Sequence, residues 1–312
     1  MDIIFFGTGS FGIPSLEALK NSSHRLLGIV PSPDKPKGRH LAVQSSPVKE
    51  WALAQGLPVF PLSNIRSKEF VEALEKLKAD LFVVISFGYL LSEKILKIPR
   101  LLCLNVHPSL LPRYRGAAPI HWALIDGEKE TGVSVVRMTK ELDAGDIALQ
   151  KKTEIFPQDD IFSLEKKLSV LGAEALLESL SRLEKGSVSF KPQNGEGLKY
   201  ARKLIKEDGH LDWRQKAESI CNRVRAMKQW PTSYGYYEGK RVILMEAEAA
   251  DTGDFRKTRP GAILSASPKE GILVMAEDKP VRIRTLQLEG KKPMSAGEFM
   301  KGFSLKPGAF FE

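Results

Sequence analysis

The stretch from Leu101 to Asp146 constrains the fold and the chemistry of this chain more than any other. Residues 101–104 form an apolar run that is long enough for a buried strand and too short for a helix. Asn105 and His107 follow at once, and the two-residue period of a strand directs both side chains to the same side. Ligands of an open parallel sheet bind beyond the carboxyl ends of its strands. An amide and an imidazole at this position are therefore placed to act on a bound molecule.

A second strand-like run, residues 133–138, leads to the sequence LDAGD, which supplies the carboxylates Asp143 and Asp146. Asn, His and Asp together suit acyl transfer from one amine to another. The Asn105 amide can donate to the oxyanion, His107 can carry the proton between the amines, and Asp143 can orient the imidazole. No Ser or Cys lies at a recognisable nucleophile turn, which favours direct transfer over an acyl-enzyme. The spacing alone fits a second interpretation equally well, in which His107 only caps a strand and Asp143 is an acid in a loop.

Strand and helix patterns alternate along the first half of the chain. The predicted strands are residues 3–6, 26–30, 59–60 and 80–86, and the predicted helices are residues 14–20, 48–55 and 68–78. This alternation implies right-handed crossovers and a mostly parallel sheet, and hence an α/β, Rossmann-like domain. Residues 147–155 alternate as an edge strand does, and Asp159 or Asp160 caps a long helix that closes this domain near Gly186.

The second half of the chain predicts another domain, because 312 residues exceed the usual size of one. A short amphipathic helix at about residues 215–227 is followed by several short strands with turns, a pattern typical of a small β-barrel. The boundaries that we expect are 1–186 for the first domain, 187–206 for a linker and 207–312 for the second domain.

The glycines of GTGSFG provide the main competing signal. Gly7, Gly9 and Gly12 satisfy the dinucleotide fingerprint G-x-G-x-x-G between a predicted strand and a predicted helix. The second strand should then end in an acid that binds the ribose hydroxyls, but residues 31–33 are Pro, Ser and Pro. We therefore interpret the glycines as a tight first turn, close to a substrate phosphate or ribose, and not as a cofactor site.

The charge of the chain points towards an anionic partner. Its formal net charge is +9 and its pI is about 9.4, although background basicity is also common. Residues 31–47 hold four prolines and the cations Lys35, Lys37, Arg39 and His40, which predicts a mobile loop over the carboxyl edge of the sheet. Such a loop could clamp an anionic substrate or could simply be solvated.

Two further basic segments lie beyond the first domain. Residues 185–206 carry six cations and one anion, which suits either a track for a polyanion or a solvated linker. Arg223, Arg225 and Lys228 lead into Trp230, a basic and aromatic grouping that suits backbone contact and base stacking.

The cysteines and histidines outside the central stretch indicate no metal site. Cys103 and Cys221 have neither metal-ligand nor disulfide spacing, so we expect two free thiols in a reducing cytosol. His121 is expected to pack beside Trp122, and the remaining histidines have no acidic neighbour at a meaningful spacing. No targeting segment precedes the first strand and no apolar run could span a membrane, which predicts a cytoplasmic protein.

Seven segments together resemble one protein family. NVHPSLLPRYRGAAPIHWAL and TGVSVVRMTKELDAGD resemble the core of the folate-dependent formyltransferases. The flanking segments are similar to those of the bacterial members that act on methionyl-tRNA. These segments are PSPDKPKGRH, SFGYLL, YARKLIKEDGHLDW, RAMKQWPTSY and GKKPMSAGEF. The resemblance covers nearly all of the chain.

The resemblance implies a fold, a reaction and a set of site residues. It implies a Rossmann-like catalytic domain, an OB-like second domain that contacts tRNA, and formyl transfer from 10-formyltetrahydrofolate to initiator methionyl-tRNA. Asn105, His107 and Asp143 would be catalytic, no metal would be needed, and the protein would act as a monomer. The residues expected to bind the folate are Phe87, Gly88, Tyr89, Leu90, Ser109, Leu110, Leu111 and Pro112. The resemblance carries over Arg39 as a contact to the tRNA, and the charge pattern adds Lys35, Lys37, Lys203, Lys206 and Arg223 to the residues expected to bind it.

Four rival functions stay open on the sequence. A sugar-nucleotide formyltransferase shares the catalytic core, but its acceptor is far less anionic than tRNA and leaves the basic segments unexplained. Hydrolysis of formyltetrahydrofolate leaves the basic second domain without a role. A nucleic-acid-binding protein with a degenerate catalytic domain is disfavoured by the intact Asn–His–Asp set. The hypothesis of a nicotinamide oxidoreductase rests on Gly7, Gly9 and Gly12 alone.

Overall fold

The computed structural model describes residues 1–37, 42–60, 64–251, 253, 255 and 258–312. The chain divides into two compact units. The first unit contains Met1–Pro119, Glu130–Glu154 and Glu165–Arg202, and the second contains Ile120–Lys129, Ile155–Leu164 and Lys203–Glu312. Most of the segment that we expected to be a linker therefore belongs to the first unit, while the functional boundaries at 186 and 207 stay a prediction.

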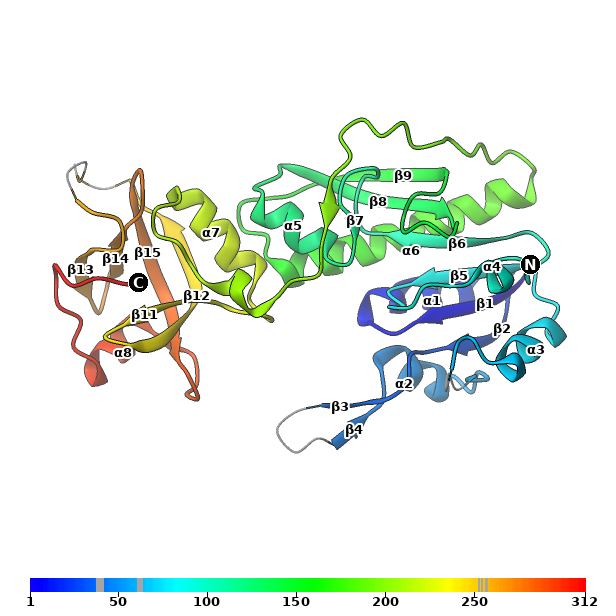
Figure 1. The fold of residues 1–312 in the computed structure, drawn as a ribbon, viewed down its shortest axis with the longest axis horizontal. Coiled ribbons are helices and arrows are strands. Elements are labelled where there is room, and N and C mark those ends of the chain that lie inside the picture. Colours follow the sequence, from blue (N-terminus) through cyan, green and yellow to red (C-terminus); the bar gives the residue numbers. More distant parts are fainter. Residues whose placement is uncertain (38–41, 61–63, 252, 254, 256–257) are drawn as a thin grey trace. The chain divides into compact units, whose positions relative to one another are not determined.

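The first unit is built on a six-stranded sheet with the order β2-β1-β5-β6-β8-β9 (Figure 1). Its strands are β1 (Asp2–Gly7), β2 (Arg25–Val30), β5 (Leu81–Ile85), β6 (Leu102–His107), β8 (Glu130–Arg137) and β9 (Ile147–Glu154). The first four are parallel, whereas β8 is antiparallel to β6 and β9 is antiparallel to β8. The predicted mostly parallel α/β fold is confirmed, with β9 as the predicted edge strand. Residues 59–60 form no strand and make only the bridge between Ile29 and Val59.

Five helices in the described part of the chain accompany these strands, and all but α1 begin with a side-chain cap. They are α1 (Ile13–Lys20), α2 (Pro47–Ala54), α3 (Lys68–Lys76), α4 (Glu93–Leu96) and α6 (Ile161–Glu184). The hydroxyls of Ser46, Ser67 and Ser92 accept the backbone N–H three residues later, which satisfies one free donor at each helix start. At the start of α6, Asp160 Oδ1 accepts the N–H groups of residues 162 and 163, as the sequence predicted.

The glycine-rich turn after β1 is tight. It continues as a short 3-10 helix, η1 (Ser10–Gly12), before α1. A Cβ atom on Gly7 would lie 2.8 Å from the carbonyl oxygen of Ile85 on β5, so the close approach of the two strands requires glycine. On β5 itself, all five side chains are buried, which explains the uninterrupted apolar run LFVVI.

Two short ladders correct the loop predictions. Strands β3 (Lys35–Lys37) and β4 (Ala42–Gln44) pair antiparallel where we expected an unpaired loop. Pro36 is compatible with this ladder because both strands of a two-stranded ladder are edge strands, and edge strands tolerate proline. Strand β7 (Arg115–Gly116) pairs parallel with β10 (Tyr200–Ala201), so the predicted linker joins the structure beside β6.

The second unit is an antiparallel sheet around its own core. The strands are β11 (Ser233–Tyr237), β12 (Lys240–Ala249), β13 (Ile263–Ser267), β14 (Gly271–Met275), β15 (Pro280–Leu288) and β16 (Met294–Ser295). Their order is β11-β12-β15-β14-β13, and β16 pairs with β15. The C-terminal residues bond to Tyr236 on β11 and to Gly261 and Ile263 at β13, which closes the sheet into the predicted barrel.

Helices and aromatic side chains fill the core of this barrel unit. The elements outside the sheet are α5 (Pro119–Ile125), η2 (Lys206–Gly209), α7 (Ala217–Ala226) and α8 (Ala296–Gly302). Helix α7 buries Ile220 and Val224 in the core, next to Trp213, Tyr237 and Phe311. The predicted helix at residues 215–227 is thus confirmed to within two residues at its start.

Candidate active site

The three residues singled out in the central stretch meet at the end of β6. Strand β6 pairs with β8 so that Asn105 lies opposite Val136, and the loop that follows β8 brings Asp143 to both polar side chains. Asn105 Nδ2 donates to Asp143 Oδ1 at 3.2 Å, and His107 Nδ1 lies 3.6 Å from Asp143 Oδ2. The side chains of His107 and Asp143 are 5% and 9% exposed. Asp146, the other acid of the motif, instead pairs with Arg137 at 4.0 Å.

Two backbone groups hold the histidine and the aspartate, and sequence reasoning missed both. His107 Nε2 lies 2.8 Å from the carbonyl oxygen of Tyr114, and the N–H of Gly116 donates to Asp143 Oδ2 at 2.9 Å. A carbonyl can only accept, so Nε2 carries a proton and Nδ1 is the nitrogen that faces Asp143. A proton transfer by His107 would therefore use Nδ1.

The backbone that provides these groups is unusual. Tyr114 has a φ of +61° and Gly116 a φ of +122°. A Cβ atom on Gly116 would lie 2.6 Å from the carbonyl oxygen of Ala201, so only glycine fits between β7 and β10. The glycine in RYRG was the one sequence signal for this geometry, because the residue type does not reveal which backbone N–H or carbonyl groups bind other residues.

Asp143 is held as an acceptor of hydrogen bonds. Its carboxylate receives the amide N–H of Asn105 at one oxygen and the backbone N–H of Gly116 at the other. Its own φ of +51° lies in the left-handed region, which costs a non-glycine residue on the order of 1–3 kcal/mol. The amide of Asn105 has a second N–H, which can donate to an oxyanion in the adjoining cleft.

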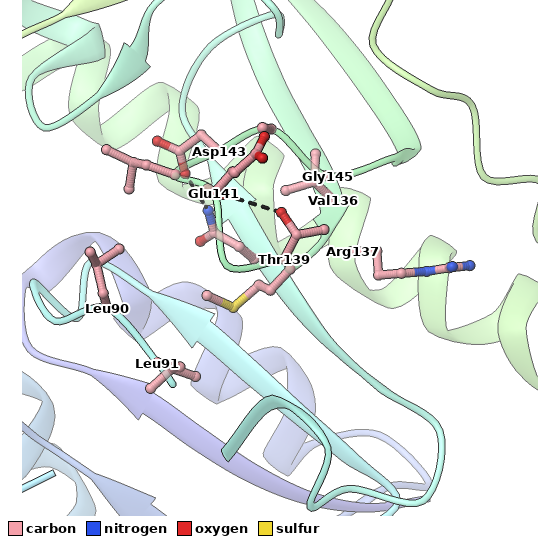
Figure 2. A pocket seen from close by; sticks show the side chains of 12 residues that line it. Leu90, Leu91, Val136, Arg137, Thr139, Glu141, Asp143 and Gly145 are labelled. Atoms are coloured by element: carbon pink, nitrogen blue, oxygen red, sulfur yellow. Dashed lines mark hydrogen bonds between the residues drawn. The ribbon is translucent and has the colours of Figure 1, made fainter. Parts of the chain in front are cut away.

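A narrow cleft opens beside this cluster (Figure 2). Asn105 and Asp143 line it, together with apolar side chains and with Arg137, Thr139, Glu141, Ala144 and Gly145. The apolar side chains are Leu90, Leu91, Val136, Met138 and Leu142. Figure 2 shows Leu90 and Leu91 across from Thr139, Glu141, Asp143 and Gly145. Apolar walls that end at an amide and a carboxylate suit a flat heterocycle whose reactive atom is polar.

The residues expected to bind the folate are divided between two cavities. Leu90 lines the cleft, whereas Phe87, Gly88 and Tyr89 line a separate cavity of about 290 Å³ that the turn after β1 also lines. Phe87 is 3% exposed, and its ring packs against Phe6 at 5.4 Å. Sequence reasoning did not identify Met138 and Leu142 as lining residues, because residues after a strand show no periodic pattern.

The segment Ser109, Leu110, Leu111 and Pro112 does not contribute to the described lining of the cleft. Its backbone is bound internally. The Ser134 hydroxyl accepts the N–H of Leu111 at 3.0 Å and donates to the carbonyl of Ser109 at 2.6 Å, and Gln150 Nε2 donates to the carbonyl of Leu111. These bonds fix the chain that leaves His107, so the segment supports the histidine; its contact with folate stays a prediction.

The residues expected to bind tRNA are scattered. Lys35 and Lys37 belong to β3, Arg39 lies outside the described residues, and Lys203 and Lys206 are exposed in the second unit. Arg223 Nη1 donates to the carbonyl of Asp208 at 2.7 Å and thereby ties α7 to η2.

The basic and aromatic grouping near Trp230 is largely engaged within the second unit. Arg225 donates to the carbonyls of Phe156 and Asp159, and burial lowers the pKa of its guanidinium. Lys228 binds Asp160 at 3.0 Å. Trp230 is 51% exposed. Two cations of the grouping that was expected to contact nucleic acid, Arg225 and Lys228, are therefore engaged in contacts within the protein.

Four other cysteine and histidine side chains, those of Cys103, Cys221, His24 and His121, are largely buried. Burial raises the pKa of the Cys103 thiol to about 12 and is the main cause of the same value at Cys221; both thiols are free, as predicted. Burial lowers the pKa of His121 to about 4. His24 does have an acidic neighbour, since its Nδ1 lies 3.4 Å from Glu184, which is far away in the sequence.

The described part of the chain lacks two features. It contains no group of three or more His, Cys, Asp or Glu side chains arranged to hold a metal ion. Each helix described there is too short or too polar to cross a membrane.

Comparisons with known proteins give a consistent result. The family model described as formyl transferase matches residues 1–180, and the model of the formyl transferase C-terminal domain matches residues 203–304. The methionyl-tRNA formyltransferase of Sulfurihydrogenibium sp. is 39% identical over 313 residues, 100% of both chains. That of Geobacter metallireducens is 41% identical over 308 residues, which are 99% of this chain and 97% of that protein.

Two solved structures share the fold. HypX from Aquifex aeolicus, in complex with tetrahydrofolic acid, has a TM-score of 0.66 and 20% identity, and the match covers 99% of this chain and 50% of that one. WlaRD, a sugar 3N-formyl transferase, has a TM-score of 0.66 and 17% identity, and the match covers 94% of this chain and 99% of that one.

Proposed function

The chain belongs to the formyl transferase family, and we propose that it transfers a formyl group from 10-formyltetrahydrofolate to the amino group of initiator methionyl-tRNA. The observation that carries this proposal is the full-length identity of 39–41% to methionyl-tRNA formyltransferases. The meeting of Asn105, His107 and Asp143 supports it independently, because these groups supply what transfer between two amines requires.

The reaction is a direct attack. The amine nitrogen of the methionyl group bonds to the formyl carbon, and the tetrahedral intermediate carries its negative charge on the formyl oxygen. Asn105 donates its free amide N–H to that oxygen. His107 Nδ1 takes the proton from the attacking amine, and it returns a proton to the folate nitrogen as the bond between that nitrogen and the formyl carbon breaks.

Asp143 makes this proton transfer favourable. While His107 holds the extra proton, the carboxylate 3.6 Å away stabilises the positive ring. The ring keeps its orientation because Nε2 donates to the carbonyl of Tyr114, and the carboxylate keeps its position because Asn105 and Gly116 donate to it. The protein thus needs no covalent intermediate on its own side chains.

We propose that the cleft, whose volume is about 30 Å³ in this structure, receives the reactive end of the donor. The donor carries a flat pterin ring and supplies the activated formyl group. Leu90, Leu91, Met138 and Leu142 provide apolar walls for such a ring, and the polar end of the cleft lies at Asn105 and Asp143. The roles of Ser109, Leu110, Leu111 and Pro112 and of the turn at Phe87 in holding the folate remain part of the proposal.

The proposal extends to the partner and the compartment. The acceptor is an aminoacyl-tRNA, so the exposed cations Lys203 and Lys206, together with Lys35, Lys37, Arg39 and Arg223, are proposed to contact its phosphates. The relatives are methionyl-tRNA formyltransferases of Sulfurihydrogenibium and Geobacter, and we propose that this chain likewise acts in a bacterial cytoplasm. A monomer suffices, because each group of the described catalytic cluster comes from one chain.

A competition assay tests the function. Labelled formyl from 10-formyltetrahydrofolate is offered to methionyl-tRNA, with a UDP-amino sugar and water as competing acceptors. We expect rapid labelling of the tRNA that slows as salt is raised, because each phosphate contact releases counterions. Labelling of the sugar would replace the acceptor in our proposal, and release of formate alone would make the protein a hydrolase.

A further inference from the structure

The side chain of Gln193 lies at the centre of a hydrogen-bond network that reaches the catalytic cluster through the backbone of Asp143. Gln193 Nε2 donates to the carbonyl oxygens of Asp143 and Gly145, both at 2.8 Å. Its Oε1 accepts Nε and Nη2 of Arg115, at 3.0 and 2.6 Å. Both amide donors and both acceptor positions of one neutral side chain are therefore used.

Each partner of Gln193 is part of a loop that carries catalytic groups. Asp143 and Gly145 belong to the loop after β8, and Asp143 has the left-handed φ of +51°. Arg115 lies between Tyr114, whose carbonyl binds His107, and Gly116, whose N–H binds the Asp143 carboxylate. Gln193 thus ties the loop that carries the aspartate to the backbone that orients the histidine.

The chain on both sides of Gln193 is fixed against the same two loops. Lys191 exchanges two backbone hydrogen bonds with Ile147, at the start of β9. The carbonyl of Lys199 accepts the N–H of Arg115 at 2.9 Å, and β10 then pairs with β7. The Arg137 guanidinium lies 4.0 Å over the ring of Phe190. Residues 187–202 of the predicted linker, for which a polyanion track and a solvated spacer were both open, therefore belong to the first unit.

We propose that Gln193 is a positioning residue for the formyl transfer, which holds the Asp143 backbone in its left-handed conformation and so sets the distance from the carboxylate to His107. The inference rests on the proposed function for its assay. A group displaced by about 1 Å can lose about a hundredfold in rate, so we expect a loss of about 10- to 100-fold in kcat when the network is broken.

The test compares substitutions of matched size in the full-length protein. Gln193→Met keeps the length of the side chain and removes all four hydrogen bonds. Gln193→Glu keeps acceptors for Arg115 but has no donor for the two carbonyls when ionised. Asn194→Met is the control, because Asn194 is exposed and contacts only Glu196 among the hydrogen bonds that the structure describes.

We expect both Gln193 variants to lose kcat while their KM for methionyl-tRNA stays within about threefold of the wild-type value, and Asn194→Met to match the wild type. The kcat losses of Gln193→Met and Arg115→Met should not add in the double variant, because both break one network. A purely structural role would lower the unfolding temperature and leave kcat of the folded protein unchanged, and that result would overturn the proposal. If wild-type protein formylates the amino sugar and not the tRNA, the proposed function fails, and the same kcat ratios measured on the sugar decide the role of Gln193.

Discussion

The substitution Asp143→Asn isolates the charge of the catalytic carboxylate. The new side chain has the same shape, but it is neutral and one of its two polar ends is a donor. Asp143 currently accepts one N–H at each oxygen, from Asn105 and from Gly116. Whichever way the new amide turns, its NH2 group meets another donor, so one hydrogen bond is lost along with the charge.

The size of the effect follows from the geometry. A protonated His107 Nδ1 and a carboxylate oxygen 3.6 Å apart attract each other by about 4.6 kcal/mol at an effective dielectric constant of about 20. The neutral variant forfeits this attraction in the intermediate, where the ring is charged. Because about 1.4 kcal/mol corresponds to a factor of ten in rate, kcat should fall by about a thousandfold.

The assay is single-turnover transfer of labelled formyl to methionyl-tRNA, with saturating 10-formyltetrahydrofolate. Affinity for tRNA should change little, because Asp143 is 9% exposed and lies in the catalytic cluster. Asp146→Asn is the matched control: it alters the other acid of the same loop, which is 39% exposed and pairs with Arg137. If Asp143→Asn retains kcat within tenfold of the wild type, then the charge does not support the proton transfer and our mechanism is wrong.

Three further outcomes are expected. Burial lowers the pKa of His121 from 6.5 to about 4, so its imidazole stays neutral in the folded state. The contribution of His121 to the free energy of unfolding is therefore highest above pH 6.5 and declines as the pH falls towards 4, because the unfolded state takes up the proton first. His121→Gln should therefore reduce the loss of unfolding free energy between pH 7 and 4.5 by about 2–3 kcal/mol in urea titrations, and equal losses would contradict this. Iodoacetamide at pH 8 should leave Cys103 unmodified in the folded protein and alkylate it in guanidinium. The reason is that a thiol with a pKa of about 12 is protonated at pH 8 and reacts slowly. Rapid labelling of the folded protein would refute the burial of Cys103. Arg39→Ala should reduce by about one the slope of log affinity for tRNA against log salt, relative to Arg66→Ala, and an unchanged slope would remove Arg39 from the interface.

The sequence predicted those features that a pattern of side chains encodes. Apolar runs such as LFVVI are visible because a strand covered on both faces must be apolar throughout. Asn105 and His107 were predictable because the period of a strand places them together at its carboxyl end. Asp143 was a candidate from its motif, but its distance to His107 depends on the antiparallel return of β8, which no local pattern specifies.

Features made by the backbone or by distant partners could not be predicted. The carbonyl of Tyr114 and the N–H of Gly116 exist in nearly every residue type, so only the fold reveals that they bind the catalytic pair. A count of charges treated Arg225 and Lys228 as available for nucleic acid. The structure gives them partners at Asp159 and Asp160, about seventy residues earlier in the chain.

Residues 185–206 show why a charge count describes a linker incompletely. Their six cations and one anion predicted a polyanion track or a solvated spacer, and both interpretations considered only side chains that face solvent. The backbone of the same segment is bonded at Lys191 and at Lys199, and between these points the neutral Gln193 holds the Asp143 loop. A phosphate bound by the cations of this segment would therefore act on a chain that is already attached to the catalytic loops. Residues 185–202 of this segment belong to the same packed unit as the proposed catalytic centre. A substitution that removes one of their cations must therefore be compared with one that spares the backbone bonds before its effect is assigned to tRNA binding.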